Sequence, residues 1–459
     1  MEKQLAENKM GVMPVGKLLV NMAGPMIVSM LVQALYNVVD SMFVARVNED
    51  ALAALSLAFP MQNLMIAVAS GLGVGMNAMI SRSLGEKRHD WANRYAMQGI
   101  LLEVIGYIAF LLIGLFAARP FIAVQAGGME RITDYGTVYL TICCACSFGF
   151  FLQMTMERIL QSTGRTMLTM ITQSTGAVIN IILDPILIFG LLGAPQLGVA
   201  GAAIATVIGQ CIAGSLALFF NLTRNYDVRL QIGLLRPHKE SLWHILAIGI
   251  PSILMMSIGS LMTFCVNKIL IVFSSTAVAV FGVYFKLQSF VFMPVFGLNN
   301  GLVPIVSYNY GARKRERMNT AIRLAFRTAV CIMLVGFLIF QLMPDKLLLL
   351  FGASEDMLGI GIPALRIISI SFLVAGICVV SGSVCQALSK GLYSLLISFG
   401  RQIVVLVPAA FILAQFGVVD LVWLAWPIAE VASLSLSIFF VRRTLKGLDW
   451  TQPDGKEIT

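Results

Sequence analysis

Two aspartates lie inside long apolar stretches of the chain, where charged side chains are rare. Asp40 lies within LVQALYNVVDSMF and Asp184 within NIILDPILIFG. An ionised side chain at the centre of a bilayer costs roughly 2.5 to 3.5 kcal/mol on insertion scales, so each one needs a partner or a function. A buried carboxyl group can take up and release a proton, or it can bind a small cation.

The residues before Asp40 place it on a polar stripe. Three polar residues precede it by three, four and seven positions, which puts them on one face of a helix: Asn37, Tyr36 and Gln33. Such a face must point toward the protein interior or a water-filled cavity. We expect these side chains to line a central cleft.

Asp184 lies on a similar stripe, with Asn180 one turn before it and Gln173 two turns further back. Pro185 follows and cannot donate to the carbonyl of Ile181, which leaves that oxygen free for a cation or water. Burial favours the neutral form of a carboxyl group and suits a proton site, whereas several converging oxygens suit Na⁺. The residues leave both ions open. The structural alternative is that each aspartate only stabilises helix packing through hydrogen bonds.

Other charged residues inside apolar stretches are weaker candidates. Glu103 is expected to pair with a basic group, and Glu157 and Arg158 are expected to extend from a helix end toward water. Lys268 is either a fixed cation in the cleft or half of a structural ion pair. The same half of the chain also carries Lys286, Arg401 and Glu430.

The composition is that of an integral membrane protein. Hydrophobic residues make up 58% of the 459 residues, only 12% are charged, and the mean hydropathy is +0.87. A helix needs roughly 20 apolar residues to cross a bilayer. Twelve helices are predicted, at residues 17–45, 52–81, 95–117, 136–160, 167–192, 199–221, 243–273, 277–307, 321–343, 359–388, 393–415 and 419–440.

The sequence repeats itself without a gap at a shift of 226 residues. Gly71, Gly75 and Gly85 then coincide with three glycines of the second half: Gly297, Gly301 and Gly311. The first two of each set have the small-xxx-small spacing that lets helices pack closely. The same order of segments in both halves predicts two six-helix lobes related by a pseudo-two-fold axis along the membrane normal, with a cleft between them.

The expected organisation is a lead at 1–16, an N-lobe at 17–222, a linker at 223–242, a C-lobe at 243–443 and a tail at 444–459. Lys and Arg gather after the second, sixth and eighth predicted helices, which predicts a multi-pass protein of the cell (inner) membrane with both termini in the cytoplasm. Since these loops account for the net charge of +9, nucleic acid is not an expected partner.

Several function classes are disfavoured. All eight cysteines lie within the predicted helices, where they behave as small apolar residues, so neither disulfides nor a metal centre is expected. No Walker A, HExxH or GxSxG motif occurs, and we therefore expect neither ATP hydrolysis nor another enzymatic activity. We expect the chain to act as a monomer and to draw on an ion gradient.

The chain resembles the multidrug and toxic compound extrusion (MATE) transporters over about residues 14–445. The resemblance rests on AGPMIVSMLVQALYNVVDSMFVA, NIILDPILIFGLLGAPQLGVAGAAIAT and VPIVSYNYGARKRERM. It implies export of cationic amphipathic drugs and dyes by alternating access, without a cofactor. It further implies a cation-coupling site, for H⁺ or Na⁺, at Asp40, Asn180 and Asp184.

One branch of the MATE family uses carboxylates in the second lobe. Here residues 243–273 and 359–388 contain no Asp or Glu, so the resemblance favours the branch that couples through the first lobe. The alternative function is a lipid-linked precursor flippase or another polytopic exporter of the same superfamily. A flippase would need cations in the cleft to hold a pyrophosphate, and the candidates are Lys268, Lys286 and Arg401.

Overall fold

The computed structural model describes residues 7–47, 49–448 and 450, and this part of the chain is almost entirely helical. In it, ten helices are long and apolar enough to cross a membrane, and two bent helix pairs bring the number to twelve. The predicted all-α membrane fold is confirmed. The outer parts of the predicted lead and tail, residues 1–6 and 451–459, lie outside the described residues.

The first half of the chain begins with the short helix α1 and supplies six crossings. Its elements are α1 (Lys9–Val12), α2 (Val15–Ala45), α3 (Glu49–Gly85), α4 (His89–Leu112), the π-helical η1 (Ile113–Ala117), α5 (Ala118–Ala126), α6 (Glu130–Ala145), α7 (Phe148–Ser162), α8 (Thr166–Phe189), η2 (Leu191–Gly193) and α9 (Val199–Arg224).

The second half follows after a connection that contains the short helix η3 (Ile232–Leu235). Its elements are α10 (Lys239–Leu270), α11 (Ser275–Gly311), α12 (Arg315–Leu342), α13 (Pro344–Leu349), α14 (Glu355–Ser369), α15 (Phe372–Ala387), α16 (Gly391–Phe399), the π-helical η4 (Gly400–Leu406), α17 (Val407–Ala414), α18 (Val419–Val422) and α19 (Ala425–Lys446).

Two predicted helices, 136–160 and 359–388, are bent rather than continuous. The chain turns by 44° between α6 and α7 and by 52° between α14 and α15. A serine lies at each break: the Ser147 hydroxyl donates to the Cys144 carbonyl (2.7 Å), and the Ser371 hydroxyl donates to the Ile368 carbonyl (2.6 Å). A hydroxyl that bonds back to the preceding turn favours a bend. The two bends occupy nearly corresponding places in the two lobes.

The repeated glycines bring the lobes into backbone contact. A Cβ added to Gly75 of α3 would lie 2.4 Å from the Ile245 carbonyl oxygen of α10, and one added to Gly301 of α11 would lie 2.7 Å from Cα of Ala23 in α2. Each lobe therefore offers a glycine face to the first long helix of the other, as expected for small residues at a membrane helix interface.

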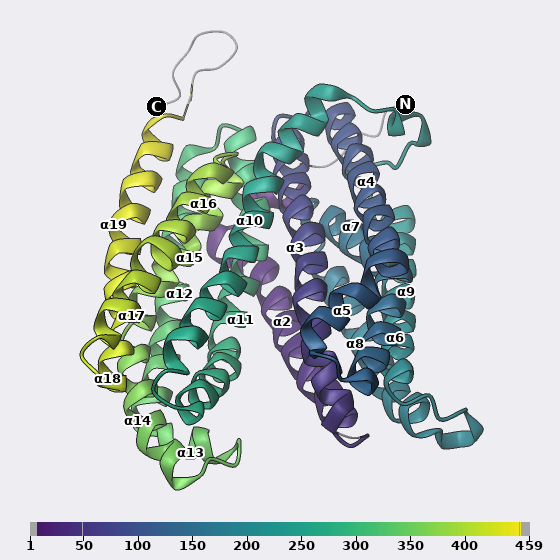
Figure 1. The fold of residues 1–459 in the computed structure, drawn as a ribbon. Coiled ribbons are helices and arrows are strands. Elements are labelled where there is room, and N and C mark those ends of the chain that lie inside the picture. Colours follow the sequence, from purple (N-terminus) through teal and green to yellow (C-terminus); the bar gives the residue numbers. More distant parts are fainter. Residues whose placement is uncertain (1–6, 48, 449, 451–459) are drawn as a thin grey trace.

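The two lobes approach each other at one end of the bundle and diverge toward the other (Figure 1). The N and C labels both lie at the end where the lobes meet, which we call the terminal face. There Gly85 and Gly311 pack against the partner backbone, since added Cβ atoms would lie 2.1 Å from the Tyr308 oxygen and 2.2 Å from the Arg82 oxygen, respectively. At the other end, the opposite face, lie α13 and α18.

Candidate functional site

The two predicted aspartates meet inside the first lobe. The carboxyl groups of Asp40 on α2 and Asp184 on α8 lie within hydrogen-bonding reach of each other. Asp184 is fully buried, and Oδ1 of Asp40 is buried without a hydrogen-bond partner among the described residues. Two carboxyl groups can share a hydrogen bond only if one of them carries a proton. The pair can therefore hold a proton, and the unpartnered oxygen is a further acceptor.

Asn180 completes the site from one turn earlier on α8. Its amide nitrogen donates to Oδ2 of Asp184 (3.2 Å), and its amide oxygen accepts from the hydroxyl (3.2 Å) and the backbone N–H (3.1 Å) of Thr206. This is the orientation of the amide that satisfies both of its groups. Thr206 lies on α9, which approaches α8 closely because Gly176 and Gly209 face each other; a Cβ on Gly209 would lie 2.8 Å from the Gly176 oxygen.

A third side of the site comes from α2 and α6. Tyr36 lies within electrostatic reach of both aspartates, and Tyr139 of α6 lies within reach of Asp40. The Tyr139 hydroxyl accepts from the Gln62 amide of α3 (3.3 Å). Sequence reasoning missed Thr206, Tyr139 and Gln62 as site residues. Only Gln62 had a signal, because it coincides with Gln288 in the repeat.

The other predicted cleft residues lie apart from the acid pair or at its margin. Gln33 is half-buried and Asn37 is exposed on α2. Gln173 points to a different acid, since its amide donates to Oε2 of Glu157 (2.7 Å). Lys268 is exposed near the end of α10 over the ring of Phe264, and it has no acidic partner among the described residues.

Glu157 and Arg158 do not extend toward water, which corrects the sequence prediction. Their exposed fractions are 1% and 9%. Three side chains donate to the Glu157 carboxylate at 2.7 to 3.0 Å: Gln153, Thr172 and Gln173. This burial could not be predicted, because the space for Arg158 comes from another helix: a Cβ on Gly73 of α3 would lie 2.8 Å from Cγ of Arg158.

Arg158 also reaches the second lobe. Its guanidinium donates to Oδ1 of Asn300 on α11 (3.0 Å) and to Gln161 (3.0 Å). Glu103 faces the positive charge of Arg158, but neither of its carboxylate oxygens has a hydrogen-bond partner among the described residues. The ion pair expected for Glu103 is therefore not formed as a direct contact.

The charges of the C-lobe are differently arranged. Arg401 and Glu430 form an ion pair at 2.7 Å, and Lys286 is exposed on α11. The pairing neutralises Arg401, one of the three cations on which the flippase alternative depended.

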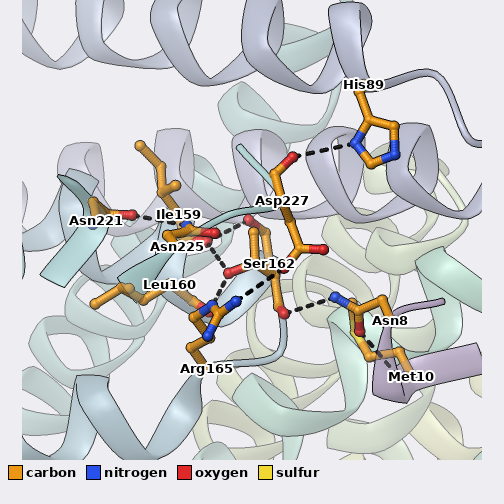
Figure 2. Close-up of polar contacts among 11 residues, drawn as sticks. Asn8, Met10, His89, Ile159, Leu160, Ser162, Arg165, Asn221, Asn225 and Asp227 are labelled. Carbon is orange, nitrogen blue, oxygen red and sulfur yellow. Dashed lines mark hydrogen bonds and ion pairs between the residues drawn. The ribbon is translucent and has the colours of Figure 1, made fainter. Parts of the chain in front are cut away.

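The N-terminal segment ties the two lobes together at the terminal face. The Asn8 amide donates to the Thr163 carbonyl at the end of α7 (3.0 Å). Asn8 is labelled in Figure 2. On the other lobe, Asn309 donates to the carbonyl of Met10 (3.1 Å), and Arg317 donates to that of Met13 (2.6 Å). We call residues 8–13 the clasp.

Polar contacts of the first lobe surround the clasp. Arg165 and Asp227 form an ion pair at 3.4 Å, and the backbone oxygen of Asp227 contacts Nδ1 of His89 at 3.3 Å (Figure 2). At the edge of the clasp, the Lys314 ammonium donates to Glu7 and holds the pKa of that carboxyl below its ordinary value. The clasp and the contacts of Gly85 and Gly311 thus close the terminal face between the lobes.

Comparison with known proteins gives consistent results. The MatE family matches the chain twice, over residues 25–186 and 251–412, an offset equal to the 226-residue shift of the repeat. The multidrug export protein MepA of Staphylococcus haemolyticus is 26% identical over 427 residues, covering 93% of each chain. MepA of Staphylococcus aureus is 28% identical over 415 residues, covering 89% of this chain and 90% of its own.

Solved structures share the whole fold. A MOP superfamily transporter from Pyrococcus furiosus superposes with a TM-score of 0.91 at 25% identity, covering 97% of this chain and 99% of its own. The structure described as the outward-facing conformation of a multidrug resistance MATE family transporter gives the same values. The predicted two-lobe architecture is confirmed.

Proposed function

Because the chain belongs to the MatE family, we propose that it is an antiporter that exports cationic amphipathic compounds in exchange for an inward-moving cation. The similarity to multidrug export proteins supports the direction and the broad substrate class. The chemistry of the exchange rests on the acid pair of the first lobe.

We propose the proton as the coupling ion. The observation that supports this choice is that the carboxyl groups of Asp40 and Asp184 lie within hydrogen-bonding reach of each other, because two such groups can bond to each other only if they share one proton. An added proton on Oδ1 of Asp40 would remove the last negative charge of the pair.

The shape of the bundle supports a cycle of alternating access. With the terminal face in the cytoplasm, as the positive-inside pattern predicts, the structure corresponds to a state that is closed inward. Proton uptake from outside neutralises the pair and lowers its attraction for a cationic substrate, which leaves outward. The terminal face then opens, the proton is released to the cytoplasm, and the negative site attracts the next cation.

Dye efflux from proteoliposomes tests this function. We expect an imposed proton gradient to drive efflux and an imposed Na⁺ gradient to have no effect. Asp40→Asn and Asp184→Asn should each lower proton-driven efflux at least about tenfold, since the loss of a titrating group removes the coupling. The matched control is Asp345→Asn on α13, which changes an exposed aspartate outside the site. Full efflux in both site variants, or efflux driven by Na⁺ alone, would overturn the proposal.

A further inference from the structure

A groove lies on the surface of the C-lobe, between helices that play no part in the acid site. It encloses about 660 Å³ between α12, α15 and α19, a volume within the range of small-molecule sites. Its walls are mainly apolar, with Val330 from α12, Ile377 from α15 and Ile438 from α19. Ile438 and the neighbouring Cys331 are exposed, so the groove opens to the surroundings of the bundle.

Two arginines stand at the rim of this groove. Arg327 belongs to α12 and Arg442 to α19, and both are exposed. Neither has a hydrogen bond or an ion pair with any residue that the structure describes. A pair of unmatched guanidinium groups beside an apolar wall attracts an anion, and their planar donors fit the oxygens of a phosphate group.

Charged and apolar parts of the groove are separated along the membrane normal. Arg442 lies one turn before the end of α19 at Lys446, and Arg327 lies in the first half of α12, which begins at Arg315; both helix ends belong to the terminal face (Figure 1). Val330 and Ile438 lie further from that face, because Val330 follows Arg327 on α12 and Ile438 precedes Arg442 on α19, while Phe326 lies beside Arg327. The polarity matches a lipid with its headgroup at the terminal face and its tail directed into the bilayer.

We propose that this groove binds one anionic glycerophospholipid from the leaflet at the terminal face. The phosphate lies between Arg327 and Arg442, and an acyl chain runs along Val330, Ile377 and Ile438. A lipid with a net negative charge is favoured over a zwitterionic one, whose amine opposes the two arginines. The site is separate from the acid pair and does not depend on the proposed transport cycle.

Native mass spectrometry of the purified full chain in detergent tests the site. Phosphatidylglycerol and phosphatidylcholine with identical acyl chains are titrated separately, and we expect one phosphatidylglycerol to bind in preference. A basic residue near an anionic headgroup contributes roughly a fivefold gain in affinity. Arg327→Gln combined with Arg442→Gln should therefore weaken phosphatidylglycerol binding by about 30-fold.

The matched control removes the same charge from the same two helices outside the groove, as Arg323→Gln combined with Arg443→Gln; both are exposed arginines that do not line it. This pair should bind phosphatidylglycerol as the unaltered chain does. Equal binding of the two lipids, or equal loss in both double variants, would overturn the proposal. Competition by inorganic phosphate as strong as that by phosphatidylglycerol would also overturn it, by showing a free phosphate site. Asp40→Asn should bind the lipid normally, which separates this test from that of transport.

Discussion

The glycine contact at the terminal face provides a direct test of alternating access. Gly311 of α11 lies so close to α3 that an added Cβ would be 2.2 Å from the Arg82 carbonyl oxygen, whereas ordinary contacts begin at 3.4 Å. The obstacle is backbone, so it cannot be relieved by a change of rotamer. Gly311→Ala therefore forces the two helices apart wherever the terminal face is closed.

The size of the effect follows from this overlap. Overpacking of a close-packed contact costs about 1 to 3 kcal/mol. If the terminal face separates in the other state, that state does not carry this cost, and the equilibrium shifts toward it by roughly 5- to 150-fold. The same argument applies to Gly85→Ala, since its Cβ would lie 2.1 Å from the Tyr308 oxygen.

Distance measurements between spin labels at the opposite face report this equilibrium. Leu192 in the N-lobe and Leu350 in the C-lobe are 91% and 78% exposed, so both accept labels in a cysteine-free background. We expect Gly311→Ala to populate a shorter distance, because the opposite face closes when the terminal face opens. Gly282→Ala on the same helix is the control, since its Cβ would meet nothing within 4 Å. An unchanged distance distribution in folded Gly311→Ala would refute the reasoning.

Three further predictions concern the ion pair, the clasp and the site amide. Glu430→Gln leaves Arg401 unpaired in the C-lobe and should lower the free energy of unfolding by about 3 kcal/mol. Changing both Arg401 and Glu430 to Met should recover most of this loss. A loss in the double variant equal to that in Glu430→Gln would contradict the pairing. Lys314 lowers the pKa of Glu7 from 4.5, so the stability that Glu7 contributes is present above pH 4.5 and is lost as the pH falls further. Glu7→Gln should therefore lower the melting temperature slightly and by the same amount from pH 6 to 8. The difference between the variant and the unaltered chain should shrink under acid conditions. Thr206→Val removes the hydroxyl that donates to the amide oxygen of Asn180, and it should lower proton-driven efflux about fivefold. Thr206→Ser keeps a hydroxyl at this position and should retain the efflux.

Most of the fold could be predicted from the sequence, because lipid imposes simple rules. Apolar length set the positions of twelve crossings, and the repeat at 226 residues predicted two equivalent lobes. The bends could not be predicted, since Ser147 and Ser371 differ little from the many serines that do not bend a helix. The additional helical turns outside the apolar stretches could not be predicted either, because hydropathy does not report them. An example is the start of α10 at Lys239.

The candidate site was predicted only in part, for a geometric reason. Asp40 and Asp184 were identifiable because buried acids are rare in apolar segments. Thr206 and Tyr139 were not, since a single hydroxyl on a helix has no spacing to mark it. Gln173 shared the helical stripe of Asp184 and yet donates to Glu157, because three turns along α8 carry a side chain to a different neighbour.

The asymmetry between the lobes bears on how the proposed ion binding would affect the second lobe. At the repeat shift, the three site positions fall on buried apolar residues of the C-lobe, namely Val266, Leu406 and Ala410. The C-lobe therefore cannot respond to the ion through equivalent groups of its own. The helix that links the two is α2, which carries Asp40 and also provides the backbone surface on which Gly297 and Gly301 of α11 rest. A change in the charge of Asp40 that shifts α2 must also move the contact between α2 and α11, because close-packed backbone atoms cannot move independently of each other. We infer that α2 transmits the state of the acid pair to the C-lobe.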